Sequence, residues 1–357
     1  MRIQDIFNAR AVALNRTEVQ SNKIPFLGEQ FFPNNTVMGL DLKWIKSQKG
    51  LGVALAPSNF DALATIRPRQ GFNVVRNEMP LFRESMQVKE RDMMEIARIQ
   101  AADDPYADAV LADIYDDTNT LLDGADIAVE RMRMQLLAPI GGEMVISIGT
   151  KDNMIYNYDY DADDVWKGTN YMAITNAADK WSASTATPLT DLKTAKQALA
   201  NKGYNAVYAI MNSTTFDYLV SVTQIANALI TITGQPVSYI DDDTVKEVFR
   251  RKTGITPIVY DKQYVGYDGN TAKFYPDNYV TVIGADTVGQ TIYGTTPEQR
   301  TLLGDPKADV AILDKGVAVA VQTTYGPPVA TATTVSQVVL PSFELMDAVY
   351  VMKVAGA

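Results

Sequence analysis

Residues 105–138 carry the pattern of one long α-helix. From Val110 onward, apolar residues recur at spacings of three and four, which is the period of a helix face that packs on a core. Asp104 suits the N-cap position, Pro139 ends the segment, and Gly124 is its weakest point. A continuous helix of this length would extend about 50 Å, well beyond an average globular helix. The pattern favours a thin, elongated domain over a compact ball.

The segments around this helix divide the chain into blocks of different character. Residues 1–40 lack a regular period and indicate an extended arm, whereas residues 50–88 hold short apolar runs between prolines and predict a long hairpin-like excursion. Residues 143–158 predict a β-hairpin. Helices and strands mix in residues 186–283, and strands return in residues 284–357. The chain therefore belongs to the α+β class.

Residues 186–283 contain start and stop signals for three helices. Thr190 is placed to cap the first, which Gly203 ends, and Ser213 is placed to cap the second. The third is predicted over 243–252 and closed by Gly254. The aspartates that precede it are better explained as a cap than as a weak site for a divalent ion.

Composition removes most catalytic chemistry. The 357 residues include no Cys and no His, which excludes Cys nucleophiles, Ser-His-Asp triads and the common zinc sites. Lys plus Arg is 32 and Asp plus Glu is 42, so the net charge is −10. A surface field of this sign does not favour coating nucleic acid. With this length, two or three subdomains are expected.

The N-terminus does not resemble a signal peptide, because Arg2, Asp5 and Arg10 interrupt it. The sequence has no apolar run of the roughly 18 residues that a membrane span needs. We therefore expect a soluble protein that stays in the cytoplasm where it is made.

A second acidic pattern also suggests a metal site. Asp159, Asp161 and Asp163 have the spacing that opens an EF-hand calcium loop. Such a loop needs Gly at its sixth position and Glu at its twelfth, where this chain has Asp164 and Asn170. We therefore favour a solvated acidic turn. The sequence holds no phosphate-binding loop and no nucleotide fingerprint, so we expect no catalytic residue, cofactor or metal.

Several segments resemble one family in their order and spacing. They are Ile24–Gly28, Phe31–Pro33, Leu55–Pro57, Pro188–Leu192 with the helix up to Gly203, Tyr293–Glu298, Gln322–Thr323, Pro327–Pro328 and Val335–Phe343. With these segments the chain resembles the lambda-type major capsid proteins of tailed phages, the capsid protein E family.

This resemblance implies the Hong Kong 97 (HK97-like) phage capsid fold. The implied parts are an N-terminal arm (1–40), an extended E-loop (50–88), a P domain with a spine helix (89–185, helix 105–138), an A domain (186–283) and C-terminal strands that return to the P domain (284–357). The arm and the E-loop lack the apolar period of an independent core, so neighbouring subunits are expected to supply their burial.

The implied function is that of a structural subunit of a tailed-phage head and not of an enzyme. Hexamers and pentamers would form an icosahedral shell that encloses double-stranded DNA without sequence-specific binding. The subunit would assemble in the host bacterial cytoplasm, with scaffold, portal and decoration proteins as further partners, no membrane, and no covalent cross-links. The alternatives are an encapsulin-type nanocompartment shell and a carboxylate-dependent hydrolase.

Charge patterning adds a hypothesis about how subunits meet. The segment 66–83 is locally basic, with Arg67, Arg69, Arg76 and Arg83 against a single acid, Glu78. Residues 103–126 are acidic and contain no Lys or Arg. In the implied fold the E-loop lies across the neighbouring P domain, so the arginines are expected to pair with the acidic helix of the next subunit. The helix positions singled out are Asp108, Asp113, Asp116 and Asp117. The alternative is two independent solvated faces.

Overall fold

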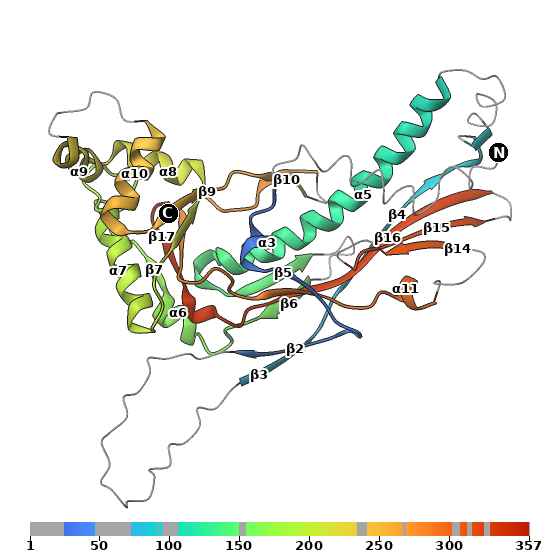
Figure 1. The fold of residues 1–357 in the computed structure, drawn as a ribbon, viewed down its shortest axis with the longest axis horizontal. Helices are drawn as coiled ribbons and strands as arrows, with labels where there is room; N and C mark the ends of the chain where they lie inside the picture. Colours follow the sequence, from blue (N-terminus) through green and yellow to red (C-terminus); the bar gives the residue numbers. More distant parts are fainter. Residues whose placement is uncertain are drawn as a thin grey trace, which may run out of the picture. The chain divides into compact units, whose positions relative to one another are not determined.

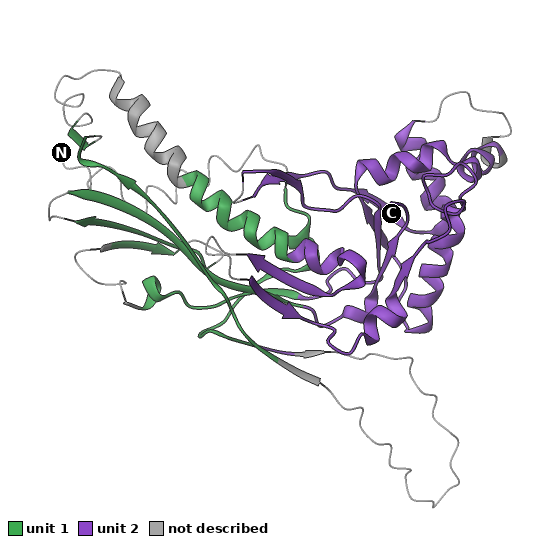
Figure 2. Cartoon of the chain, turned by 180° about the vertical axis from the view of Figure 1, so that it is seen from behind, with its two compact units in different colours: residues 1–42, 76–132, 290–342 green, residues 43–75, 133–289, 343–357 purple. Residues whose placement is uncertain are grey.

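The computed structural model describes residues 25–46, 73–91, 93–94, 106–149, 155–233, 241–266, 269–301, 308–312, 316–324 and 329–356. The chain forms two compact units, coloured separately in Figure 2. Unit 1 comprises residues 1–42, 76–132 and 290–342, and unit 2 comprises residues 43–75, 133–289 and 343–357.

Unit 1 is built around one six-stranded sheet. Its strands run in the order β1-β13-β16-β15-β14, and β4 also pairs with β16. The elements are α3 (Gly28–Phe31), β1 (Asn34–Thr36), β4 (Leu81–Val88), β13 (Gln290–Tyr293), α11 (Pro297–Thr301), β14 (Ala308–Ile312), β15 (Ala318–Thr324) and β16 (Ala330–Ser342). Figure 1 shows β4, β16, β15 and β14 side by side.

Strand β16 organises this sheet. It is 13 residues long and rich in Val and Thr, residue types that suit a half-buried pleated surface. Its first part pairs antiparallel with β15 on one edge and with β4 on the other, and its last residues pair antiparallel with β13. Most of β16 is buried, as expected for a central strand.

The predicted long helix is confirmed. Helix α5 spans Tyr106–Leu137 without a break at Gly124. Inside unit 1, the side-chain amide of Gln337 on β16 donates a hydrogen bond of 2.9 Å to the carbonyl oxygen of Ala125. The backbone N–H of Gly28 donates a hydrogen bond of 2.9 Å to the fully buried carboxylate of Glu130. Both the sheet and α3 are therefore tied to α5.

Unit 2 contains a five-stranded sheet in the order β7-β17-β12-β8-β9. Its strands are β7 (Tyr171–Ala173), β8 (Tyr208–Met211), β9 (Thr256–Val259), β12 (Tyr279–Ile283) and β17 (Val349–Lys353). The helices are α6 (Val165–Asn170), α7 (Pro188–Asn201), α8 (Ser213–Ser221), α9 (Thr223–Thr233) and α10 (Asp242–Thr253). The shorter elements are η2 (Ile140–Gly142), β10 (Gln263–Val265), β11 (Thr271–Lys273) and η3 (Met346–Ala348).

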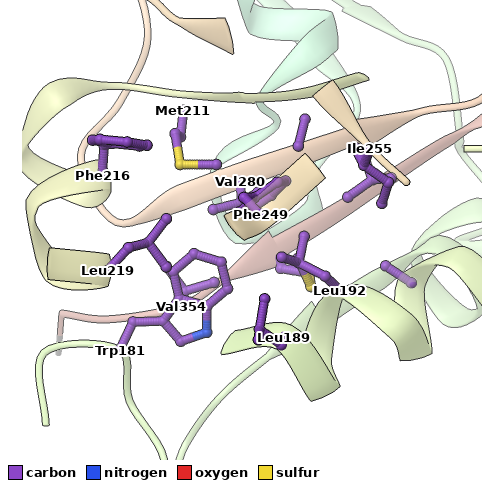
Figure 3. Packing of buried hydrophobic residues seen from close by; sticks show 14 of the residues in the cluster. Trp181, Leu189, Leu192, Met211, Phe216, Leu219, Phe249, Ile255, Val280 and Val354 are labelled. Carbon is purple, nitrogen blue, oxygen red and sulfur yellow. The ribbon is translucent and has the colours of Figure 1, made fainter. Parts of the chain in front are cut away.

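The core of unit 2 lies between this sheet and helices α7 to α10 (Figure 3). Trp181, Leu192, Phe249 and Val280 are among its fully buried side chains. Helix α7 contributes the residues that the sequence predicts, because Leu192, Ala195 and Leu199 recur at helical spacing and are all buried.

Two predicted helix starts are wrong by a few residues. Helix α7 begins at Pro188 with Thr187 at its N-cap, and not at Thr190. Proline is favoured in the first turn, where its missing N–H costs no hydrogen bond. Helix α8 is capped by Asn212, whose side chain accepts from the N–H of Thr215, and not by Ser213. The third prediction is confirmed: the side chain of Asp241 caps α10 by accepting from the N–H of Thr244.

The predicted hairpin is confirmed as β5 (Val145–Gly149) paired antiparallel with β6 (Ile155–Asp159). Two further two-stranded sheets join β2 (Asp41–Lys46) to β3 (Asn73–Glu78) and β10 to β11. The C-terminal segment departs from the expected division. Strands β13 to β16 belong to unit 1, whereas β17 pairs with β12 and β7 in unit 2.

Other predictions fall outside the described residues. They are most of the N-terminal arm, the body of the E-loop between residues 47 and 72, and the cap at Asp104.

Candidate assembly surface

Of the four predicted contact arginines, the structure describes two. Arg67 and Arg69 lie outside the described residues, and Arg76 is an exposed residue of β3. Arg83 lies on β4, opposite Ser336 of β16 in the antiparallel register. Residues that face each other in this way point to the same side of a sheet, so Arg83 and Ser336 share one face.

On that face Arg83 binds an acid of its own chain. One guanidinium nitrogen lies 2.5 Å from Oε1 of Glu298 on α11, and the Ser336 hydroxyl donates a hydrogen bond of 2.6 Å to Oε2 of the same carboxylate. The Glu298 side chain is 8% exposed, whereas that of Arg83 is 46% exposed. The carboxylate therefore connects α11, β4 and β16 within unit 1. Sequence analysis missed Glu298, because no local pattern signals a partner so distant in the chain.

The acidic candidates Asp108, Asp113, Asp116 and Asp117 all lie on α5. Their side chains lie outside the described part of the structure. A pairing between these aspartates and the arginines of a second subunit is a contact that one subunit does not contain. The pairing between subunits therefore stays a prediction. For Arg83, a carboxylate of a second subunit would be an additional partner, because Glu298 of its own chain already binds it.

The acidic turn before α6 is a helix cap. The Asp161 carboxylate accepts hydrogen bonds of 2.9 Å from the backbone N–H groups of Trp166 and Lys167. Asp159 accepts one of 2.9 Å from the N–H of Asp161. Asp161 is 5% exposed, so the expected solvated turn is wrong for this residue. Its oxygens satisfy amides that the first turn of a helix leaves without partners.

Two further observations bear on chemistry. Among the described residues, no group of three or more acidic side chains is placed to hold a metal ion. Within the same residues, no helix is long and apolar enough to cross a membrane.

Strand β4 is the most exposed part of the described sheet in unit 1. Six of its eight residues are exposed, including Leu81 and Met86. It forms the last part of the excursion that the sequence predicts over residues 50–88, and it carries Arg83. Within the described residues, the candidate surface for contacts between subunits is therefore this exposed strand, on which Arg83 is anchored by Glu298.

Comparison with protein families identifies the chain. A family model described as phage major capsid protein E matches residues 11–308. The chain belongs to the phage major capsid protein E family. No curated protein matches it.

Solved structures confirm the fold. A protein assigned as the capsid protein of an Escherichia coli CFT073 prophage has a TM-score of 0.59 and 14% identity, over 98% of this chain and 99% of that chain. A phage-related protein from Bordetella bronchiseptica gives 0.54 and 12%, over 97% and 96%. The capsid asymmetric unit of cyanophage A-1(L) gives 0.50 and 13%, over 95% and 98%.

The expected Hong Kong 97 capsid fold is therefore confirmed, and the chain is a major capsid protein of the tailed-phage type. The family match favours this assignment over a nanocompartment shell or a hydrolase. It also indicates a virion component with a structural role.

Proposed function

We propose that this protein is the repeating subunit of an icosahedral phage head, and that hexamers and pentamers of it enclose double-stranded DNA. The observation that carries the proposal is the family match over residues 11–308, together with the capsid fold. The charge of −10 is compatible with a wall that does not bind the packaged DNA tightly.

Expression of the chain alone tests this proposal. Sedimentation followed by negative-stain microscopy should show capsomers or closed shells far heavier than one 39.2 kDa chain. A uniform small particle at all concentrations and salt conditions would contradict it. Scaffold, portal and decoration proteins remain proposed partners, and assembly in the host cytoplasm is proposed with them.

We also propose that the E-loop arginines bind the acidic stretch of α5 in the next subunit. Each exposed pair would contribute only about 0–1 kcal/mol, but every subunit of the shell would repeat the contact. Replacing Arg67 and Arg69 by Glu should leave the subunit folded and impair assembly, and added salt should weaken wild-type capsomers.

A control must carry the same change in charge. Lys193 on α7 and Lys252 on α10 are exposed, and replacing both by Glu makes the chain more acidic by the same amount. If the arginine variant and the lysine variant assemble equally well, the proposed contact is wrong.

A further inference from the structure

Strand β4 is an edge strand within the described part of the chain. It pairs antiparallel with β16 along its whole length, from Leu81 opposite Val338 to Val88 opposite Thr331. No other described strand pairs with its second edge. Figure 1 shows β4 beside β16, on the side away from β15. An edge of eight residues offers a row of backbone donors and acceptors to another strand.

The register fixes which backbone groups point outward. The N–H of Val339 donates to the carbonyl oxygen of Pro80 at 3.4 Å, so this opposed pair is a hydrogen-bonded one. Hydrogen-bonded and non-bonded pairs alternate along an antiparallel ladder. The residues whose N–H groups face β16 are therefore Phe82, Glu84, Met86 and Val88. The residues whose N–H groups face outward are Leu81, Arg83, Ser85 and Gln87.

An ordered apolar turn lies at the start of this edge. Met38 is 96% exposed, and Val37 and Leu40 are 42% and 46% exposed. The turn is nevertheless fixed, because the N–H of Met79 donates to the oxygen of Leu40 at 2.9 Å and the N–H of Val37 donates to the oxygen of Tyr293 at 2.8 Å. Because the backbone of the turn is already fixed, covering these side chains costs little backbone entropy.

The turn also depends on close backbone approach. Gly39 has a φ of +109°, a backbone conformation that residues other than glycine rarely adopt. A Cβ on Gly294 would lie 2.5 Å from the oxygen of Gly39. Both glycines hold Met38 at the surface, where nothing in the described chain covers it.

We propose that the outer edge of β4, together with the apolar turn 37–40, is the docking site for a strand of a second copy of this chain. This inference rests on the proposed function, which brings copies into contact. Backbone hydrogen bonds would come from the outward groups of β4, and the turn and Leu81 would supply apolar area. The new strand would extend the sheet of unit 1 across the subunit boundary.

Charge favours a second copy as the occupant. Residues 73–91 hold four basic residues and three acidic ones, a balance of +1 in a chain of net −10. Two acidic subunits repel each other least where this segment meets the other copy. DNA fits less well, because Arg83 is engaged by Glu298 and exposed apolar side chains do not bind phosphate.

Amide hydrogen exchange distinguishes the two edges of β4 residue by residue. In the unassembled subunit, the amides of Phe82, Glu84 and Met86 should exchange slowly, and those of Arg83 and Ser85 should exchange fast. In shells made from this chain alone, the outward amides should slow by at least tenfold. Outward amides that are already slow in the isolated subunit would overturn the proposal, because the chain itself would then cover the edge. Outward amides that stay fast in the shell would overturn it as well.

A pair of variants at one position gives an independent test. Ser85→Pro removes an outward N–H and leaves the inward ladder intact, because proline is tolerated on an edge strand. Ser85→Ala keeps the N–H, and both variants lose the 3.2 Å contact between the hydroxyls of Ser85 and Thr334. Ser85→Pro should lower shell yield at least tenfold, whereas Ser85→Ala should assemble normally.

Shells of Ser85→Pro at the yield of Ser85→Ala would overturn the inference. If the proline variant does not fold, the exchange experiment on the wild type still decides the question. The failure of the proposed function would look different, because wild-type protein would then form no shells at all.

Discussion

Replacing Arg83 by Ala should destabilise the unassembled subunit by more than the loss of a surface ion pair. The variant leaves the Glu298 carboxylate buried at 8% exposure with the Ser336 hydroxyl as its remaining neighbour from this cluster. A hydrogen bond to a charged group is worth about 1.5–3 kcal/mol. Because Arg83 is itself 46% exposed, solvent screens the pair, and we expect a loss of about 2 kcal/mol.

The matched variant is Glu298→Gln. A neutral amide can still accept from Arg83 and donate to Ser336, so we expect a loss of about 1 kcal/mol. In the Gln background, Arg83→Ala should cost little, because no buried charge is left without its partner. The double-mutant cycle should therefore give a coupling energy of about 1–2 kcal/mol. Arg76→Ala, at an exposed site on β3, is the control and should change stability by about 0.5 kcal/mol or less.

The assay must report on unit 1. All three tryptophans, Trp44, Trp166 and Trp181, belong to unit 2. Tryptophan fluorescence would therefore report the unfolding of unit 2 and not that of unit 1. Urea unfolding of dilute subunits should be followed by far-ultraviolet circular dichroism, with the slope of the transition compared between variants. If the changes in unfolding free energy of the two single variants sum to that of the double variant within about 0.3–0.5 kcal/mol, Arg83 and Glu298 are not coupled and the reasoning is wrong.

Three further predictions concern unit 2 and the assembled shell. Asp161→Ala should lower the free energy of unfolding of unit 2 by about 1–2 kcal/mol, since the backbone amides of Trp166 and Lys167 lose their acceptor. Added calcium should leave the stability of the wild type unchanged, and stabilisation by calcium would contradict the assignment of Asp161 as a helix cap. Hydrogen bonding from Lys273 lowers the pKa of Asp277 below its usual value of 3.8, so the ionised Asp277 stabilises the fold above about pH 4, and this stabilisation is lost as the pH falls through the lowered pKa. In Asp277→Asn, the free energy of unfolding should therefore fall less steeply as the pH is lowered below about 4. The same pH dependence in the variant and the wild type would contradict this prediction. Boiled shells should run as one band near 39.2 kDa on a denaturing gel, and a ladder of multimers would show covalent cross-links.

The sequence predicts elements whose signal is local and repeated. Helix α5 satisfies this condition, because its apolar residues recur over many turns, and its bounds agree with the prediction within one residue at each end. Helix starts are less certain. Near α7 both Thr187 and Thr190 are chemically suitable caps, and Pro188 decides between them.

Features that depend on distant partners could not be predicted in this way. Strand β17 resembles the other C-terminal strands in sequence, yet it pairs with β12 in unit 2. Strands β7, β10 and β11 have three residues each, which is too short to show a period of two. The bond between Arg83 and Glu298 joins two segments far apart in the sequence. Only the fold brings them together.

The function followed from resemblance and not from chemistry. The absence of His and Cys removes most catalytic arrangements, but it does not indicate a capsid. Ordered segments such as Pro188–Leu192 and Val335–Phe343 carried the family assignment, and the family match over residues 11–308 confirms it. The contacts between subunits remain predictions, because one subunit does not contain them and Arg83 binds Glu298 of its own chain.

Cryo-electron microscopy of particles assembled from the purified chain tests the central claim most directly. The account predicts closed shells with icosahedral symmetry, in which this fold fits both five-fold and six-fold capsomers and the outer edge of β4 lies against a strand of a neighbouring copy. The account would be contradicted if the particles were a single small oligomer without icosahedral symmetry, or if this fold did not fit the density as a repeated subunit of a shell.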